Sequence, residues 1–257
     1  MLGNLFSAIW KVITKRPLDV LAAIYALALS NMIKDFEWMP LIIAVIWAGA
    51  FFLAVRVLYY IAVEAGYTKF TEAYTTKDIM KMAVLIAVGG IIKGYWGQIR
   101  LLGEGILGQY SGFFVSWMFY LWGILACYLV RKPFCGTISM VLGGVIEILV
   151  GNPFGLPVLL FNFMEGLGPD IVYGGIFKYR RHNLWIAILS GFVTSLIGLW
   201  YGWLYFGFAQ QEFGAFVLYL GVTFAGGILS GVIASIVIAL LNAVGVKPST
   251  EVKVETA

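Results

Sequence analysis

The sequence contains little charge and few of the groups that carry out chemistry. Charged residues make up 12% of the 257 residues, and the chain has one histidine and two cysteines. It lacks the phosphate-binding Gly-x-x-x-x-Gly-Lys-Ser/Thr loop, the zinc motif His-Glu-x-x-His and the nucleophile motif Gly-x-Ser-x-Gly. His182 lies in a basic loop, where we expect it to be solvated, and Cys127 and Cys135 lack metal-ligand spacing. The sequence therefore predicts neither an enzyme nor a protein with a metal or organic cofactor.

Long apolar runs dominate what remains. Apolar residues make up 61% of the chain, which indicates an integral membrane protein. Within a bilayer, a helix satisfies the backbone hydrogen bonds inside its own segment. We therefore predict an all-α, polytopic helix bundle. The net charge of +4 is then a matter of loop topology and not a sign of nucleic-acid binding. About eight transmembrane helices are expected, at residues 18–33, 40–62, 79–95, 111–130, 133–150, 156–177, 184–208 and 216–244.

The chain divides into three predicted parts. Residues 1–63 form an N-terminal extension, with an amphipathic helix at 1–16 lying on the membrane surface and the first two spans. Residues 78–246 form a bundle of six helices, and 247–257 form a polar tail. Between spans three and four, the segment Trp96–Tyr110 is too polar to span, so we expect it to fold back over the outer surface.

Lysine and arginine are distributed unequally between the two sides of this eight-span arrangement. Cytoplasmic loops of membrane proteins carry the excess of these residues. The richer side is therefore assigned to the cytoplasm of a prokaryote, and both termini lie there. It holds thirteen cations: Lys11, Lys15, Arg16, Lys69, Lys77, Lys81, Arg131, Lys132, Lys178, Arg180, Arg181, Lys247 and Lys253. The outer side holds three: Lys34, Lys93 and Arg100.

Three carboxylates lie within the apolar hairpin of spans five and six. An ionisable group at the centre of a bilayer costs roughly 2.5–3.5 kcal/mol on insertion scales. Glu147, Glu165 and Asp170 therefore need partners, water or a ligand. Glu147 is expected near the outer end of its helix and Glu165 near the midplane, with Asn162 on the same helical face. The alternative is that these acids only pair with buried donors between helices.

Pro169 adds a second signal to this hairpin. A proline inside a helix clashes with the carbonyl group four residues earlier, which here is the carbonyl of Glu165. We expect a break or kink there, a device that membrane transporters use at substrate sites. The alternative is a glycine-lined kink that lets helices pack closely.

Aromatic residues are concentrated at the same outer level. Trp96, Trp117 and Tyr201 are candidates for covering a flat cationic or amine-bearing heterocycle by stacking and cation–π attraction. The alternative role for each is in the aromatic belt at the membrane interface.

From Asp78 onward, the motifs resemble those of YkoE-type substrate-binding (S) components of energy-coupling-factor (ECF) vitamin transporters. The motifs that carry the resemblance are Arg131-Lys132-Pro133, Glu147 before the loop 151–155 (Gly-Asn-Pro-Phe-Gly), and 165–170 (Glu-Gly-Leu-Gly-Pro-Asp). The resemblance implies a six-helix bundle that binds thiamine or its hydroxymethylpyrimidine (HMP) precursor. Family members carry Gln at the position of Glu165, Glu at that of Asp170 and an acid at that of Met140.

The resemblance also implies partners. An S component takes its vitamin from outside and reorients against a transmembrane coupling subunit driven by two ATPases. The corresponding docking stripe is Ala83 and Ala87, whose spacing of four suits close helix approach. Packing within the bundle is the alternative role for these alanines.

The favoured function is therefore non-catalytic vitamin capture at the cell membrane, as a subunit of an ECF-type importer. The substrate-binding candidates are Glu147, Glu165, Asn162, Asp170, Trp96, Trp117 and Tyr201. The alternatives are a stand-alone secondary transporter driven by protons through the buried acids, and a membrane scaffold or enzyme subunit in which the acids are structural.

Overall fold

The structure, a computed structural model, describes residues 2–23, 53, 56–57, 60, 74–108, 111, 115–206 and 213–249. The chain divides into two compact units, Met1–Glu72 with Lys253–Ala257 and Ala73–Val252. In the first unit, helix α1 (Leu2–Lys15) occupies the segment predicted as an amphipathic helix. The predicted spans 18–33 and 40–62 fall mostly outside the described residues.

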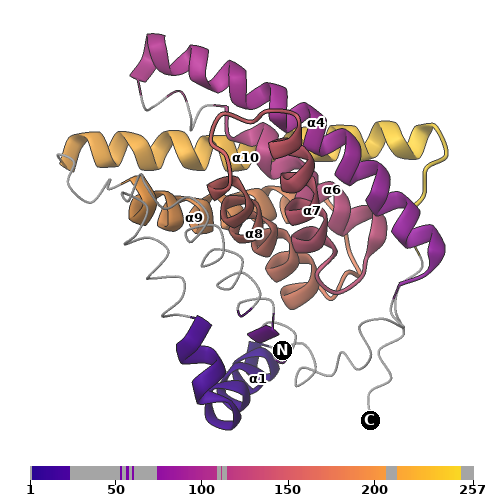
Figure 1. The fold of residues 1–257 in the computed structure, drawn as a ribbon. Helices are drawn as coiled ribbons and strands as arrows, with labels where there is room; N and C mark the ends of the chain where they lie inside the picture. Colours follow the sequence, from indigo (N-terminus) through magenta and orange to yellow (C-terminus); the bar gives the residue numbers. More distant parts are fainter. Residues whose placement is uncertain are drawn as a thin grey trace. The chain divides into compact units, whose positions relative to one another are not determined.

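The second unit contains the candidate site and is built from helices joined by short connections (Figure 1). Every regular element that the described residues form is helical, which confirms the predicted all-α class. The helices are α4 (Thr76–Leu107), α6 (Trp117–Val130), α7 (Cys135–Leu149), α8 (Pro157–Pro169), the π-helix η2 (Asp170–Ile176), α9 (Leu184–Phe206) and α10 (Phe213–Ala243).

Helix α4 corrects one prediction. It runs for 32 residues without interruption, so Trp96–Leu107 continues the helix and does not fold back separately. Its glycines are used for close packing: a Cβ on Gly94 would lie 3.1 Å from Val150, and one on Gly97 would lie 2.8 Å from Asn152 Nδ2. The polarity that suggested a surface segment comes partly from Arg100 and Glu104, which pair across one helical turn.

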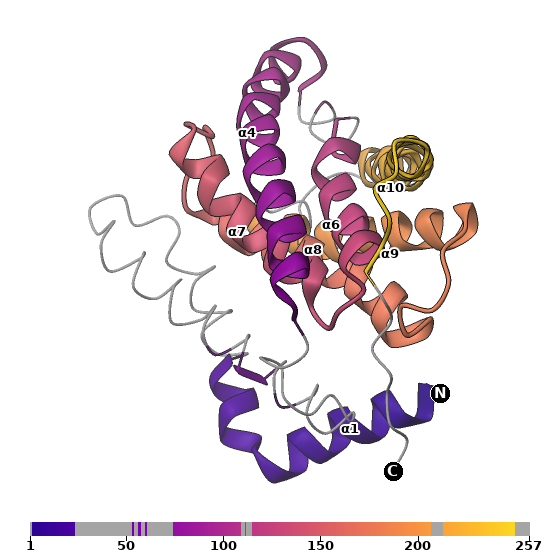
Figure 2. The same cartoon turned by 90° about the vertical axis from the view of Figure 1, so that its right-hand side faces the viewer.

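Small residues bring the helices together. A Cβ on Gly90 of α4 would lie 2.6 Å from the carbonyl oxygen of Gly143 in α7. Gly227 of α10 approaches α9 to a similar degree, since a Cβ there would lie 2.6 Å from the carbonyl oxygen of Gly191. Helices α9 and α10 lie side by side (Figure 2). Such contacts are typical of membrane helices, which gain from van der Waals packing at close range.

The helix that follows the turn between α7 and α8 changes its winding at Pro169. Helix α8 begins with Pro157 at its first turn, where a missing N–H costs nothing, and it ends at Pro169. The chain then continues as η2 from Asp170. The predicted local break at Pro169 is therefore present, as a change from α- to π-helical winding.

Two described helices are long and apolar enough to cross a bilayer, Thr76–Leu107 and Val217–Ala243. Shorter apolar helices occur at Trp117–Val130, Cys135–Leu149 and Leu184–Leu199. The count of eight spans stays a prediction.

Candidate functional site

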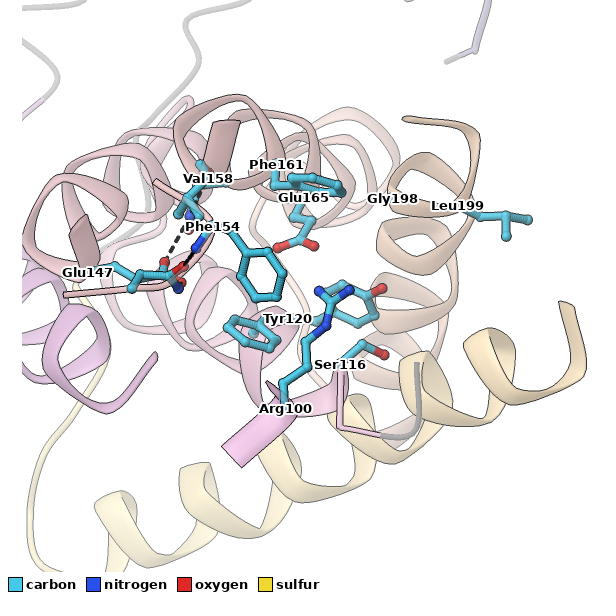
Figure 3. A pocket seen from close by; sticks show the side chains of 13 residues that line it. Arg100, Ser116, Tyr120, Glu147, Phe154, Val158, Phe161, Glu165, Gly198 and Leu199 are labelled. Atoms are coloured by element: carbon cyan, nitrogen blue, oxygen red, sulfur yellow. Dashed lines mark hydrogen bonds between the residues drawn. The ribbon is translucent and has the colours of Figure 1, made fainter. Parts of the chain in front are cut away.

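A cavity of about 60 Å³ lies where the end of α4, the start of α6, the end of α7, the first half of α8 and the second half of α9 meet (Figure 3). A space of roughly 10–15 Å³ already admits one water molecule, so this cavity is more than a packing defect. Its lining combines charged, amide and aromatic side chains: Arg100, Ser116, Phe119, Tyr120, Glu147, Asn152, Phe154, Val158, Phe161, Asn162, Glu165, Gly198 and Leu199.

Glu147 is held by a network of protein donors. Its Oε2 lies 3.3 Å from Lys93 Nζ and accepts a hydrogen bond of 3.0 Å from Asn162 Nδ2. Its Oε1 accepts one of 2.5 Å from Asn152 Nδ2. Lys93 Nζ also donates to Asn162 Oδ1. Both charged side chains are almost fully buried, so this network joins α4, α7, α8 and the loop between α7 and α8 inside the protein.

Lys93 is buried between α4 and α7. It is one of the three cations assigned to the outer side from the sequence, and its side chain is 1% exposed and pairs with Glu147. A buried ammonium group requires a counter-charge, and Glu147 supplies it.

Glu165 differs from Glu147 in having no such partners. It is buried on α8 and faces the cavity, in view of the Tyr120 ring and the Arg100 guanidinium (Figure 3). Among the described residues, none donates a hydrogen bond to its carboxyl group or forms an ion pair with it. A buried carboxyl without donors costs free energy, so this group is suited to accept hydrogen bonds from water or a ligand.

Aromatic rings and a guanidinium group form the rest of the cavity wall. Arg100 lies over the Phe154 ring, with its Cζ 4.5 Å from the ring centroid, and its Nε donates to Glu104 Oε1 over 3.0 Å. Phe119, Tyr120 and Phe161 contribute further aromatic surface. This combination of flat apolar walls and few polar groups suits a small aromatic ligand.

Three of the predicted site residues meet in this cavity: Glu147, Asn162 and Glu165. Trp96 and Trp117 do not line it. Their rings contact each other edge to face, with centroids 5.5 Å apart, and the Trp96 indole donates to the carbonyl oxygen of Val115. The side chain of Tyr201 lies outside the described part of the structure.

Asp170 also lies away from the cavity, where it caps the beginning of α7. Its Oδ2 accepts hydrogen bonds of 2.7 Å from both the backbone N–H and the hydroxyl of Thr137. Its Oδ1 accepts bonds of 3.1 Å from the Gly136 N–H and the Tyr179 hydroxyl. The residue before α7, Phe134, provides no side-chain cap, so Asp170 supplies one from another helix.

The thiols of Cys127 and Cys135 lie beside this carboxylate. The two sulfur atoms and a carboxylate oxygen of Asp170 lie within 4.8 Å of one another, and thiolates with a carboxylate are donors that zinc accepts. Both oxygens of Asp170 already accept the bonds that cap α7, so the observed geometry serves the fold without an ion. The prediction of buried free thiols is confirmed.

The sequence reasoning missed several cavity residues. Arg100, Phe119, Phe154 and Phe161 were not among the candidates. The spacing of Arg100 and Glu104 was a usable signal, because opposite charges four residues apart favour a continuous helix. Such a helix would have carried Arg100 to the end of the bundle where α6 begins and α7 ends.

Ala83 and Ala87 are exposed on α4. Gly90 and Gly94 on the same helix are buried, and a Cβ at either would lie within 3.4 Å of atoms of α7 or of Val150. The two small-residue pairs of α4 therefore face different surroundings.

Comparisons with known proteins agree with this architecture. Residues 77–197 match the family model of the ABC-type cobalt transport system, permease component. YkoE of Bacillus subtilis, which is named as an HMP/thiamine permease protein, is 23% identical over 167 residues, covering 65% of this chain and 83% of that protein. A crystal structure of an S-component of an ECF transporter superposes with a TM-score of 0.64 at 23% identity, covering 67% of this chain and 88% of the other.

The matched family and both relatives are named as transport proteins or components of transporters. The resemblance seen in the motifs is confirmed by sequence and by fold: the chain resembles YkoE, and its helical bundle has the fold of the substrate-binding component of an energy-coupling-factor transporter.

Proposed function

We propose that this protein is the substrate-binding subunit of an ECF-type importer and captures thiamine or an HMP-like precursor without catalysis. The observation that carries the proposal is the buried Glu165 carboxyl, which has no donor among the described residues and faces an aromatic-walled cavity in a bundle with the S-component fold.

The cavity residues suit an aminopyrimidine. An exocyclic amine and a ring nitrogen present donors and acceptors in one plane, and Glu165 would accept the amine N–H. The rings of Phe119, Tyr120, Phe154 and Phe161 supply faces for stacking on the heterocycle. Asn162 and Glu147 lie at the same wall, already oriented by Lys93.

The location of the cavity supports capture from outside. It forms at the end of α4, the start of α6 and the end of α7, whereas Arg131 and Lys132 lie at the opposite ends of α6 and α7. If the basic ends face the cytoplasm, as positive residues favour, the cavity lies toward the exterior and both termini are cytoplasmic. External labelling of a single cysteine in the loop of Asn152, at the exposed position 153, with position 182 protected, would test this orientation.

A vitamin-binding subunit of this kind needs a coupling subunit and two ATPases, since the chain lacks an ATP-binding loop. Ala83 and Ala87 are the proposed docking surface. They are exposed on a helix that spans the second unit, and small side chains allow a partner helix to approach closely.

The binding test is titration calorimetry of the purified protein with thiamine and with HMP. Glu165→Gln keeps the side-chain volume but removes the charge, and a hydrogen bond to a charged group contributes roughly 1.5–3 kcal/mol. We expect Glu165→Gln to weaken thiamine binding on the order of 10- to 100-fold. The control is Asp19→Asn, which removes an acid from the other unit. Wild-type-like affinity in Glu165→Gln would contradict the proposed role of this acid.

The coupling test uses the same helix at two places. Ala83→Trp should block assembly with the coupling subunit and ATPases, while calorimetry shows ligand binding intact. Ile106→Trp, a change at an exposed position near the other end of α4, is the control and should assemble normally. Uptake by the isolated protein in proteoliposomes, abolished by collapsing a proton gradient, would instead favour the secondary transporter.

A further inference from the structure

The charged groups around the cavity compensate one another unequally. Three charged residues line it, Arg100, Glu147 and Glu165, and two more, Lys93 and Glu104, stand behind them. The protein neutralises some of these acids itself. The charge that a ligand needs for binding depends on which acid is left without a positive partner.

Lys93 neutralises Glu147. The ammonium and carboxylate groups lie 3.3 Å apart, and neither side chain is exposed by more than 2%. Asn162 bonds to both of them, as acceptor from Lys93 and as donor to Glu147, and Asn152 occupies the remaining carboxylate oxygen. A ligand charge is therefore not required to stabilise Glu147.

Arg100 pairs with Glu104, although this pair is more exposed than that of Lys93 and Glu147. The pair lies one turn apart on α4, with Nε 3.0 Å from Oε1, and the guanidinium also rests on the Phe154 ring. Its positive charge is thus shared with an acid of its own helix.

Glu165 is the acid at the cavity that is left without a positively charged partner within the described part of the chain. Around the cavity the described residues contribute two positive and three negative groups, and the unmatched acid is Glu165. We infer that Lys93 is a specificity-determining residue: by neutralising Glu147 it leaves one negative charge in the cavity, that of Glu165, and so selects ligands with a single positive charge on a flat ring. This inference rests on the proposed function in taking the cavity as the substrate site, but it does not depend on thiamine being the substrate.

The inference divides the two glutamates between two roles. Glu147 positions Asn162 and joins the helices, whereas Glu165 makes the charged contact with the ligand. Removing the Lys93–Glu147 pair as a whole should preserve the preference for cations even if affinity falls. Removing the charge of Glu165 should abolish that preference.

The experiment measures the preference directly with two nearly isosteric probes, benzamidinium and benzamide, of which only the first is charged. Binding is measured by calorimetry and by ligand-induced thermal shift on the purified full chain. The variants are Glu165→Gln, the double variant Lys93→Met/Glu147→Gln and, as a control for loss of a lysine, Lys77→Gln, which is exposed at the start of α4. The double variant avoids the unpaired buried carboxylate that Lys93→Met alone would create.

We expect the wild type to bind benzamidinium at least about tenfold more tightly than benzamide, since one charge-assisted hydrogen bond contributes that much or more. Lys77→Gln and the double variant should keep this ratio within about threefold, a difference of less than 1 kcal/mol. In Glu165→Gln the ratio should fall to near one. Lys93→Met alone leaves Glu147 without its counter-charge, so it should lower the thermal midpoint and raise the ratio above the wild-type value. Adding Glu147→Gln should return both quantities toward those of the wild type.

Two outcomes would overturn the inference. One is a wild type that binds the two probes equally, and the other is a double variant that loses the preference as completely as Glu165→Gln. Failure of the proposed function looks different, because a protein that prefers benzamidinium through Glu165 but binds neither thiamine nor HMP would retain the cation site and lose only its assigned substrate.

Discussion

The cavity around Glu165 and the cluster around Asp170 are two polar regions supplied by the same helical segment. Their acids are five residues apart, and both side chains are buried. Asp170 accepts hydrogen bonds from Gly136, Thr137 and Tyr179, whereas Glu165 accepts none from the described residues. A buried carboxyl group therefore stabilises the fold in one region, whereas in the other it is available to accept hydrogen bonds from a ligand.

The difference shows how buried acids in membrane helices can be separated. Burial and apolar surroundings are common to Glu147, Glu165 and Asp170, so these properties do not distinguish a binding group from a structural one. The number of donors already directed at each carboxylate does. By this criterion Glu147 belongs with Asp170, although it lines the cavity, because Lys93, Asn152 and Asn162 are all directed at it.

The largest expected effect comes from breaking the saturated region. Asp170→Ala would leave the N–H groups of Gly136 and Thr137 and the hydroxyl of Tyr179 without their acceptor. Each buried donor left unpaired costs about 1–3 kcal/mol. We therefore expect a loss of at least about 3 kcal/mol and a fall in Tm of about 6–12 °C, measured by thermal unfolding in detergent.

Glu165→Gln is the comparison variant for this measurement and should unfold within a few degrees of the wild type. If Asp170→Ala unfolded like the wild type but bound ligand poorly, Asp170 would belong to the binding site and the contrast between the two regions would be lost.

Much of this contrast could not be predicted from the sequence. Long apolar runs predicted α7, α9 and the combined segment of α8 and η2 nearly to their ends, because runs bounded by glycine and proline leave few alternatives. The change of winding that ends α8 at Pro169 was expected only as a break or kink. The apolar runs also drew attention to all three acids. Which donors surround each acid depends on contacts between helices far apart in sequence, such as Lys93 with Glu147 and Thr137 with Asp170.

Two contacts could not be found from the sequence for the same reason. The acid that pairs with Lys93 lies 54 positions later in the chain. His182 was expected to be solvated, yet it is half-buried: its ring lies 4.5 Å from that of Tyr128, and its Nδ1 lies 2.8 Å from the Tyr173 hydroxyl. No short sequence pattern predicts either of these contacts.

A smaller effect should follow from disturbing the segment that joins the two regions. Gly168 lies between Glu165 and Asp170, and a Cβ added there would meet Thr194 of α9, at 2.5 Å from its Cα. Backbone atoms cannot move aside as a side chain can, so Gly168→Ala should separate α8 from α9. We expect a destabilisation of about 1–3 kcal/mol by thermal unfolding. An unchanged Tm would show that this helix contact is looser than the structure indicates.

Gly198 of α9 provides the opposite case, because it faces the cavity. A Cβ there would lie 3.4 Å from the Tyr120 hydroxyl and 3.8 Å from Glu165 Oε1, both ordinary contacts. Alanine also favours a helix over glycine by about 0.5–1 kcal/mol. Gly198→Ala should therefore keep or raise Tm while its methyl group occupies ligand space, weakening thiamine binding about tenfold, or ~1.4 kcal/mol by calorimetry. A variant with full affinity would place the ligand elsewhere in the cavity.

The smallest expected effect concerns His182, whose ring contacts two tyrosines but can still gain a proton. Burial, together with the smaller effect of the nearby positive charge of Arg131, lowers the pKa of His182 to about 4. In the unfolded chain the pKa would be about 6.5. Because the unfolded state binds the proton more readily, this residue favours folding fully above about pH 6.5, and that contribution is lost as the pH falls toward 4.

The measurement is Tm between pH 7 and pH 4 for the wild type and His182→Gln. Other groups titrate over the same range, so the informative quantity is the difference between the two proteins. We expect the wild type to lose up to ~1 kcal/mol more than His182→Gln, a modest value because the imidazole is only half-buried. Ligand affinity should follow the same pH profile in both proteins, since His182 does not line the cavity. If His182→Gln shifted the pH profile of ligand binding, His182 and the cavity would be coupled. The cavity and the opposite end of the bundle could then not be treated as independent regions.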